Sequence, residues 1–510
     1  MPMQFHWPTS LLLSLCMVLP PVVAAEDVEA PVINLEQAIG ATIESNYGIR
    51  LERFTAEFGE GQLTEAEGDF DWNIVSGAGA FRDRLPPWEP HVFGTDTLDW
   101  SYSLGVQRKL RNGVLLAPSF GTDSFKDPDL SNRRWATRGA VNFDMLLPLA
   151  RGAGEESAAA NERFARKDRD ARYALYRHQI ASSVLDTVAT YWESVGATQS
   201  LEILQQSEQE AAEMEETVIR LARANLFSLA YVEQAQSNSR GKKTRRVNAE
   251  LDQYKTRQAL GLSIGMEGIA LAAPPVPGEQ FPELQEPRLP ASQDYAQVIR
   301  FAQDNREDLL AAQSSREALA MLTQAARKDL KPRVDLSLHL SYDGIDQGQR
   351  PQAFLFNDHD GVRVMGGLSM EFPLENRVQS GQLRQRLADE DQAGVLREQL
   401  AQNIASEVMV ALEEVASTYT AYQVSLDAEK YFAEALAKER KRFVVGDSSF
   451  VDVVTIQDGY RDAQLETITA RQAHLVALAR LRFTTGTLVE GDAAAGSVAI
   501  DQLTEVPRFE

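Results

Sequence analysis

The chain has 510 residues and a formal net charge of −23 at pH 7, with 44% hydrophobic and 25% charged residues. So acidic a chain is not expected to bind nucleic acid, which requires basic patches. Cys16 is its only cysteine, so the rest of the chain has neither a disulfide framework nor a thiolate metal site.

The N-terminus is predicted to be a secretory signal. An apolar run over residues 11–23 is followed by two alanines and two acidic residues, which is typical of a signal peptide cut after residue 25. Residues 1–25, including Cys16, would then be removed. Lipidation of the cysteine is disfavoured because Leu15, rather than a small residue, precedes it, but the state of the mature N-terminus stays open.

The first repeat, residues 26–273, is predicted to begin with a helix over Leu35–Phe58 and to continue with strands. Apolar and polar residues alternate from Leu98 to Gln107 and again from Val141 to Leu147. Strands with one apolar and one polar face are typical of a transmembrane barrel. A soluble antiparallel sheet with one hydrated face would give the same pattern.

Two long stretches without proline dominate the rest of the chain, one between Pro148 and Pro274 and the other between Pro373 and Pro507. Proline disrupts helices, and both stretches are rich in Ala, Glu, Gln, Leu and Arg, which favour them. Each stretch is predicted to be a long antiparallel helical hairpin. The tips are expected near 225–228 and 446–449.

Four residues mark the predicted tips. Asn225 and Gly446 suit the left-handed conformation that ends a helix. Ser228 and Ser449 suit the cap of the returning helix.

A proline-rich connector, residues 274–290, leads to a second repeat over residues 291–488 and a C-terminal tail over 489–510. The second repeat is predicted to have a helix over Ser292–Leu330 and strands over 334–342 and 362–372. Four residues of the first hairpin recur in the second at a constant offset of 221; these pairs are Ser228 and Ser449, Gln236 and Gln457, Leu260 and Leu481, and Gly265 and Gly486. The chain is therefore predicted to be an internal duplication.

The first repeat is longer than the second in its strand region. It has roughly 34 more residues between Asn46 and Pro148 than the second has between Asn305 and Pro373. This excess is the size of one additional hairpin, for which residues 98–125 are the candidate. The hairpin is either an external elaboration or two more barrel strands.

Several short motifs lie along this framework. They are Leu35-Glu36-Gln37-Ala38 with Asn46, Asn305-Arg306-Glu307-Asp308-Leu309, Leu147-Pro148-Leu149, Phe372-Pro373-Leu374, and Arg442-Phe443-Val444-Val445-Gly446 followed by Ser449, Asp452 and Val453. Together with the duplicated hairpins, they resemble the TolC-type outer-membrane efflux protein family over about residues 32–488. Glu307 departs from the family's proline. The first tip departs further, with Asn225 for glycine and Tyr231 where the second tip has Asp452.

The resemblance implies an α+β membrane protein of the cell outer membrane. Its duplicated helical hairpins would form a periplasmic α-barrel, and its antiparallel strands, four per chain, would contribute to a twelve-stranded transmembrane β-barrel of a homotrimer. The implied function is passive transport, as the exit duct of a tripartite efflux or type I secretion system. The implied partners are outer-membrane lipid, a periplasmic adaptor (membrane fusion) protein and an inner-membrane pump or ABC exporter.

Two sets of site residues follow from the resemblance. The adaptor-docking tip would comprise Arg442, Gly446, Ser449, Asp452 and Val453, with Asn225 and Ser228 at the other tip. These loops could instead be simple helix reversals. Asp452, Thr455 and Asp462 recur at helical spacing and would line the pore constriction as a cation-selective ring, or else form an ordinary solvated helix face.

Two other classes of protein compete with this interpretation. A soluble periplasmic coiled-coil adaptor or scaffold explains the helices but not the duplicated strands. An enzyme is disfavoured, because the six histidines show no ligand spacing and no nucleophile or phosphate-loop motif occurs. No cofactor or metal site is therefore expected.

Overall fold

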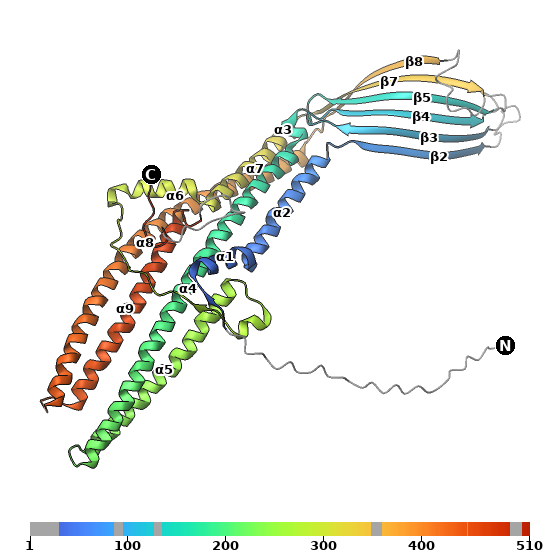
Figure 1. Ribbon diagram of the computed structural model, residues 1–510. Coiled ribbons are helices and arrows are strands. Elements are labelled where there is room, and N and C mark those ends of the chain that lie inside the picture. The colour runs from blue at the N-terminus through green and yellow to red at the C-terminus, as the bar shows by residue number, and fades with distance from the viewer. Residues whose placement is uncertain are drawn as a thin grey trace, which may run out of the picture.

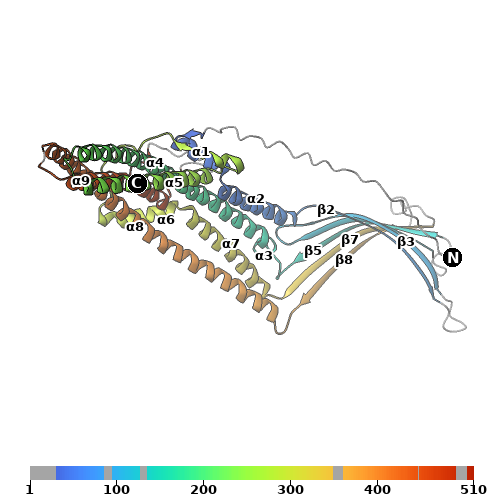
Figure 2. The same cartoon turned by 90° about the horizontal axis from the view of Figure 1, so that it is seen from below.

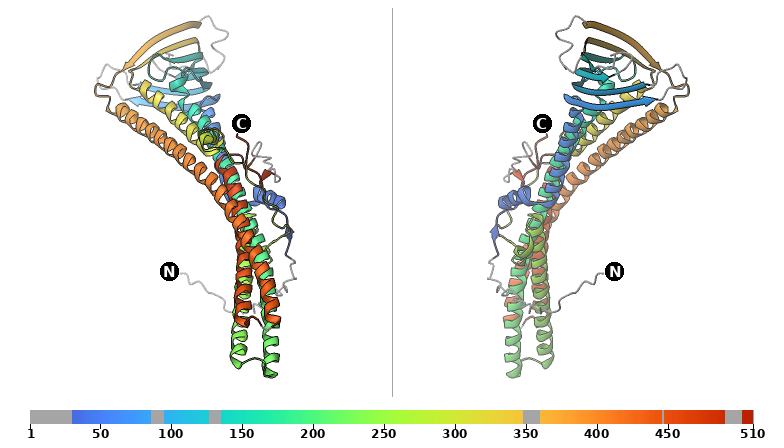
Figure 3. Two further views of the ribbon diagram at one scale, coloured as in Figure 1. Left: turned by 90° about the vertical axis from the view of Figure 1, so that its left-hand side faces the viewer. Right: turned by 90° about the vertical axis from the view of Figure 1, so that its right-hand side faces the viewer.

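The computed structural model describes residues 30–85, 95–126, 135–347, 360–445, 447–489 and 502–509. The molecule is elongated, with a sheet of long strands at one end and long helices running from it to two tips at the other (Figure 1). Other views show that the sheet is curved (Figures 2 and 3). The predicted signal, residues 1–25, lies outside the described residues.

The two halves repeat one order of elements: two helices, then strands, then a long helical hairpin. The first half comprises α1 (Leu35–Ser45), α2 (Tyr47–Gly68), β2 (Asn73–Leu85), β3 (Thr95–Lys109), β4 (Leu115–Lys126), β5 (Trp135–Pro148), α3 (Glu155–Ala158), α4 (Ala160–Arg223) and α5 (Leu229–Ser263). The second half comprises α6 (Tyr295–Asn305), α7 (Glu307–Asp329), β7 (Arg333–Gln347), β8 (Asp360–Glu371), α8 (Arg377–Val444) and α9 (Phe450–Thr484). Short elements complete the chain: β1 (Val32–Ile33), which pairs in parallel with β6 (Val276–Pro277), and the one-turn 3₁₀ helices η1 (Gly268–Ala272) and η2 (Ser292–Asp294). None of the helices described is long and apolar enough to cross a membrane.

Each predicted opening helix is broken once, which is a correction to the sequence analysis. α1 and α2 meet at Asn46, whose side chain caps α2 by accepting hydrogen bonds from the backbone N–H groups of Gly48 (2.8 Å) and Ile49 (3.3 Å). α6 and α7 meet at Arg306, which has extended backbone angles like those of Asn46 but makes no side-chain capping hydrogen bond. Arg306, and not Asn305, is therefore the structural counterpart of Asn46.

The duplication is also visible where each hairpin ends. Gly265 follows α5 with φ of 79°, and Gly486 follows α9 with φ of 74°. A Cβ on Gly265 would lie 2.5 Å from the carbonyl oxygen of Ser45, and a Cβ on Gly486 would lie 2.8 Å from that of Asn305. Both positions require glycine, for the backbone conformation and for the close approach. Each hairpin thus returns to the helix break of its own half.

All six long strands form one antiparallel sheet in the order β2-β3-β4-β5-β7-β8. The additional hairpin is β3–β4, and it lies between β2 and β5 within the sheet. The sheet of one chain therefore has six strands, against the four per chain that the resemblance implied for the barrel, because the additional hairpin pairs with neighbours on both sides. β2 and β8 remain as the free edges.

The register separates apolar from polar residues on the two faces of the sheet, because residues directly opposite each other point to the same side. One face carries Ile74, Trp100, Tyr102, Leu104, Phe120, Val141, Phe143, Leu338, Leu340, Val362, Val364 and Leu368. The other carries Asp99, Ser101, Asp123, Arg138, Asn142, Asp144, His339, Ser341, Asp343 and Arg363. On the polar face, His339 Nδ1 lies 2.7 Å from Asp144 Oδ1.

Two buried clusters hold the helices together below the sheet. The first joins α1, α4 and α9 and includes Leu35, Val184, Val188, Tyr191 and Leu475. The second joins α6, α8 and α9 and includes Val298, Ile404, Leu412, Leu478 and Leu481. Phe281 of the connector and Leu503 of the tail are buried in the first cluster. The connector and the tail therefore belong to the helical core.

Candidate functional site at the helix tips

The first tip joins α4 to α5 through residues 224–228. Asn225 has φ of 59°, the left-handed conformation that ends a helix. The N–H of Leu226 donates to the carbonyl of Leu221 at 2.9 Å, which closes the last turn. Ser228 occupies the cap position of α5, but its side chain makes no capping hydrogen bond.

The second tip joins α8 to α9, and Gly446 within it lies outside the described residues. The N–H of Asp447 donates to the carbonyl of Arg442 at 2.9 Å, which repeats the first tip's bond at the offset of 221. Unlike Ser228, Ser449 caps its helix in full. Its hydroxyl oxygen accepts from Asp452 N (3.2 Å), while Asp452 Oδ2 accepts from Ser449 N (3.1 Å).

Arg442 is engaged within its own tip. Its guanidinium donates to the Asp447 carbonyl at 2.9 Å and lies 3.0 Å from a carboxylate oxygen of Glu439, which also accepts from Ser448. These contacts give Arg442 a role in shaping the turn that joins α8 to α9.

The two tips are joined by an aromatic cluster that the sequence analysis did not identify. Phe227 and Tyr231 of the first tip lie 5.3 Å apart between ring centroids, Phe227 lies 6.3 Å from Phe443, and Tyr231 lies 6.3 Å from Phe450. Phe450 is 3% exposed. This tip cluster (Phe227, Tyr231, Phe443 and Phe450) holds the ends of the two hairpins side by side.

The predicted docking residue Val453 is 1% exposed. It is therefore unavailable for direct contact with a partner, because it packs inside the subunit. Other large apolar side chains in and next to the two tips are exposed, namely Leu226, Leu229, Val445 and Val451. Val445 lies within the second tip motif, but the sequence analysis assigned no role to these four residues.

Ion pairs connect the two hairpins above the tips. Lys242 of α5, which is almost completely buried, pairs with Asp458 of α9. Glu210 of α4 accepts hydrogen bonds from Arg440 of α8 (2.9 Å) and from Arg461 of α9 (2.5 Å). These contacts lie between the halves, so they resist separation of one hairpin from the other.

The predicted constriction residues lie along one exposed face of α9. Asp452, Thr455 and Asp462 are all exposed. The Thr455 hydroxyl donates to the carbonyl of Val451 in its own helix, and Asp462 pairs with Arg245 of α5 at 3.2 Å. Hydrogen bonds from the side chain and backbone of Ser449 lower the pKa of Asp452, so this carboxylate is ionised at neutral pH.

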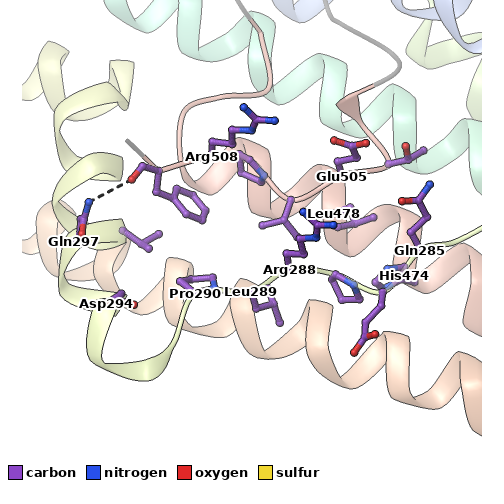
Figure 4. A pocket seen from close by; sticks show the side chains of 17 residues that line it. Gln285, Arg288, Leu289, Pro290, Asp294, Gln297, His474, Leu478, Glu505 and Arg508 are labelled. Atoms are coloured by element: carbon purple, nitrogen blue, oxygen red, sulfur yellow. Dashed lines mark hydrogen bonds between the residues drawn. The ribbon is translucent and has the colours of Figure 1, made fainter.

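A cavity of about 570 Å³ lies far from the tips, between the connector, α6, α9 and the C-terminal tail (Figure 4). At one side Gln297 donates to the carbonyl of Phe509 at 3.3 Å, which fastens the tail to α6. The charged residues around the cavity are Glu286, Arg288, Asp294, Glu505 and Arg508. No three His, Cys, Asp or Glu side chains gather into a group able to hold a metal ion in the part of the chain that the structure describes.

His474, at the base of this cavity, makes stability depend on pH. Its side chain is 1% exposed and its Nδ1 lies 3.0 Å from the Thr418 hydroxyl. Burial lowers the pKa of His474 from its ordinary 6.5 to about 4. The unfolded chain therefore binds a proton at this imidazole more readily than the folded chain does. The contribution of the neutral imidazole to folding stability is complete above pH 6.5 and is lost as the pH falls toward 4.

Between pH 6.5 and pH 4, protonation of His474 in the unfolded chain is expected to lower the free energy of unfolding by about 3 kcal/mol. In His474→Gln the change in unfolding midpoint between pH 7 and pH 4.5, followed by circular dichroism in detergent, should be smaller than in the unaltered protein. An equal change in both proteins would show that His474 does not titrate in this way.

Comparisons with known proteins agree with this architecture. Residues 298–487 match the family model described as outer membrane efflux protein. No curated protein sequence matches the chain.

Several solved structures share the fold. The CmeC outer membrane channel of Campylobacter jejuni superposes with a TM-score of 0.67 at 13% identity, covering 92% of this chain and 89% of that chain. VceC of Vibrio cholerae gives 0.63 at 15% identity, with 89% and 96% covered. The open state of the Neisseria gonorrhoeae MtrE outer membrane channel gives 0.63 at 15% identity, with 91% and 93% covered. At these identities the likeness establishes the fold.

Proposed function

We propose that this chain is a member of the TolC-type outer-membrane efflux protein family and is one subunit of an outer-membrane exit duct for tripartite efflux or type I secretion, since residues 298–487 match the outer membrane efflux protein model. The observation that carries the proposal is the six-stranded sheet with one apolar and one polar face, mounted on two long helical hairpins. Transport is passive, and an inner-membrane pump or ABC exporter supplies the energy. The helices form the periplasmic extension of the duct.

The duct is a homotrimer. A single subunit leaves the edges of β2 and β8 unpaired, and unpaired backbone groups are not tolerated in lipid. Pairing each subunit's β8 with β2 of the next copy removes every edge and closes the strands into one transmembrane barrel. The alternative, a soluble periplasmic adaptor, would leave Tyr102 (54% exposed), Val364 (74%) and Leu368 (68%) in water.

The proposal is tested by conductance in planar lipid bilayers. The purified protein is expected to insert as channels with discrete steps when it is added in detergent. A preparation that contains folded protein but gives no channel activity would contradict the proposal.

The tips dock a periplasmic adaptor through their exposed apolar residues. Leu229 is 78% exposed at the start of α5, beyond the tip cluster. A photoreactive amino acid at position 229 is expected to cross-link in cells to a periplasmic protein that mass spectrometry identifies as an adaptor. The matched control is position 269 on η1, since Ile269 is also 78% exposed but lies away from the tips. Adaptor cross-links from both positions, or from neither, would argue against docking at the tips.

Three copies of Asp452 make the resting channel cation-selective. Asp452→Asn is expected to lower the ratio of cation to anion permeability severalfold, because it removes three negative charges. The amide oxygen still accepts the hydrogen bonds of the helix cap, so the tip keeps its shape. Asp252→Asn, at an exposed residue far from the tip on α5, is the control. An unchanged ratio in the Asp452 variant would remove this residue from the constriction.

A further inference from the structure

We propose that all six strands of each subunit enter the wall of the transmembrane barrel, so that three copies close an eighteen-stranded barrel. This inference rests on the proposed function, because it assumes a trimeric channel. It concerns the β3–β4 hairpin, which decides whether each chain contributes four strands or six. The four-strand alternative would place this hairpin outside the wall.

Strand pairing continues without interruption through the β3–β4 hairpin. β3 pairs with the whole of β2, from Asn73 opposite Gln107 to Leu85 opposite Thr95. β4 pairs along its whole length with β5, from Leu115 opposite Leu146 to Lys126 opposite Trp135. β2 and β5 have no direct pairing, so the sheet continues only through the additional hairpin.

The side chains of the hairpin itself are distributed over an apolar face and a polar face. Trp100, Tyr102 and Leu104 lie on the apolar face that also carries Phe143 of β5 and Leu340 of β7. Each of them is between 44% and 56% exposed in the subunit. The intervening residues of β3, such as Ser101 and Ser103, lie on the polar face. The hairpin therefore continues both the lipid-facing band and the lumen-facing surface of its neighbours.

The turn of this hairpin packs against the end of the helices that adjoins the sheet. Arg111 donates to the Glu162 carboxylate of α4 at 2.8 Å, and Glu162 is 3% exposed. Gly113 has φ of 94°, and a Cβ there would collide with the carbonyl oxygen of Gly152. Lys109 reaches the carbonyl of Ala158 at 3.4 Å. The turn is thus seated where the other strands join the helices.

The two edge strands of the sheet, β2 and β8, can pair with each other between copies. An even number of antiparallel strands makes β2 run away from the helices and β8 run toward them. β8 of one copy can therefore pair antiparallel with β2 of a second copy. The two edge strands have 13 and 12 residues, and a membrane-spanning strand needs about 9–11. The occupant of each edge is accordingly another copy of this chain.

The size of the opening follows from the number of strands. With strands about 4.8 Å apart and tilted by about 40°, eighteen strands enclose a barrel about 36 Å across, against about 24 Å for twelve. The outer opening is then about twice as large in cross-section as a twelve-stranded barrel would give. Passage of bulky cargo is consequently limited by the helical part of the duct and its tips, and not by the outer barrel.

Cysteine labelling tests the placement of the hairpin. Single variants Ser101→Cys and Tyr102→Cys on β3 are compared with Ser337→Cys and Leu340→Cys on β7, a strand that both arrangements place in the wall; Ser337 is exposed and lies on the polar face. The expected result is that a membrane-impermeant maleimide labels the two serine positions and spares the two apolar positions. If labelling alternates on β7 but both β3 positions are labelled, or neither is, then β3 does not lie in the wall and the eighteen-stranded barrel is wrong. Loss of alternation on β7 as well would instead contradict the membrane channel itself.

Electron microscopy of the detergent-solubilised trimer gives an independent result. The unaltered protein is expected to show a ring of eighteen strands, and deletion of residues 95–134 is expected to reduce it to twelve. A ring of twelve in the unaltered protein would overturn the inference while leaving the proposed function intact. Particles that are not trimers would contradict the proposed function.

Discussion

Arg306→Ala is expected to lower the free energy of unfolding by about 3–5 kcal/mol, because it breaks a buried ion pair by removing one partner. The guanidinium is 5% exposed and donates to both carboxylate oxygens of Asp308, at 3.0 and 2.7 Å, and to Glu407 at 2.5 Å. It also lies over the ring of Phe483 at 5.5 Å. Burial of the Asp308 carboxyl would raise its pKa, but the hydrogen bonds and charge of Arg306 outweigh burial and lower it. Alanine would leave that carboxylate buried without its cation.

The measurement is the unfolding midpoint in detergent, compared with that of Arg245→Ala. Arg245 pairs with Asp462, but both side chains are more than half exposed, so this control is expected to cost no more than about 1 kcal/mol. Equal midpoints for the two variants would show that the buried pair does not stabilise the break between α6 and α7.

Phe450→Ala is expected to loosen the tips and to raise the resting conductance of the channel severalfold. Phe450 is 3% exposed and is the residue of α9 that contacts Tyr231 of the first tip. Replacing a buried phenylalanine by alanine lowers the free energy of unfolding by about 3–5 kcal/mol. Here the substitution removes the contact that holds the two hairpins together at their tips. Single-channel recordings of the purified protein measure the effect.

Leu229→Ala is the control for this experiment, because Leu229 lies at the same tip but is 78% exposed and outside the tip cluster. Its resting conductance should equal that of the unaltered protein. Comparable conductance in Phe450→Ala and the unaltered protein would show that the aromatic contacts do not keep the tips closed.

The long hairpins could be predicted from the sequence because proline-free helix formers extend over so many residues that local signals add up. β2 could not be recognised in the same way. Its centre, Ser76-Gly77-Ala78-Gly79-Ala80, consists of small residues that obscure the alternation. Only its pairing with β3, which supplies Trp100 and Tyr102 opposite Ala80 and Ala78, shows which face each residue occupies.

The packing of the first tip could not be predicted from the sequence, for a different reason. Tyr231 occupies the position in the first repeat that Asp452 occupies in the second. From the sequence alone, the first tip would therefore be described only as having lost the motif. In the structure the second tip keeps a polar cap between Ser449 and Asp452, whereas the first tip replaces it with aromatic packing of Tyr231 on Phe227 and Phe450. Phe227 belongs to the same hairpin as Tyr231, but Phe450 comes from the other hairpin, so no local pattern could reveal the exchange.

Of the two helix breaks, only the one at Asn46 could have been predicted from the sequence. Asn46 is a good cap residue, and its interruption of the first helix could have been recognised from that property. Arg306 is not a cap residue, and its position is fixed by Asp308 and by Glu407 of α8. The contact with Glu407 joins residues 101 apart in the sequence, so it depends on the completed fold.

The mass of the native protein after extraction tests the trimeric outer-membrane channel most directly. The mature chain is expected to stay with the outer membrane through osmotic shock, to need detergent for release, and to have the protein mass of three chains by light scattering corrected for bound detergent. Release by osmotic shock as a soluble monomer would contradict it.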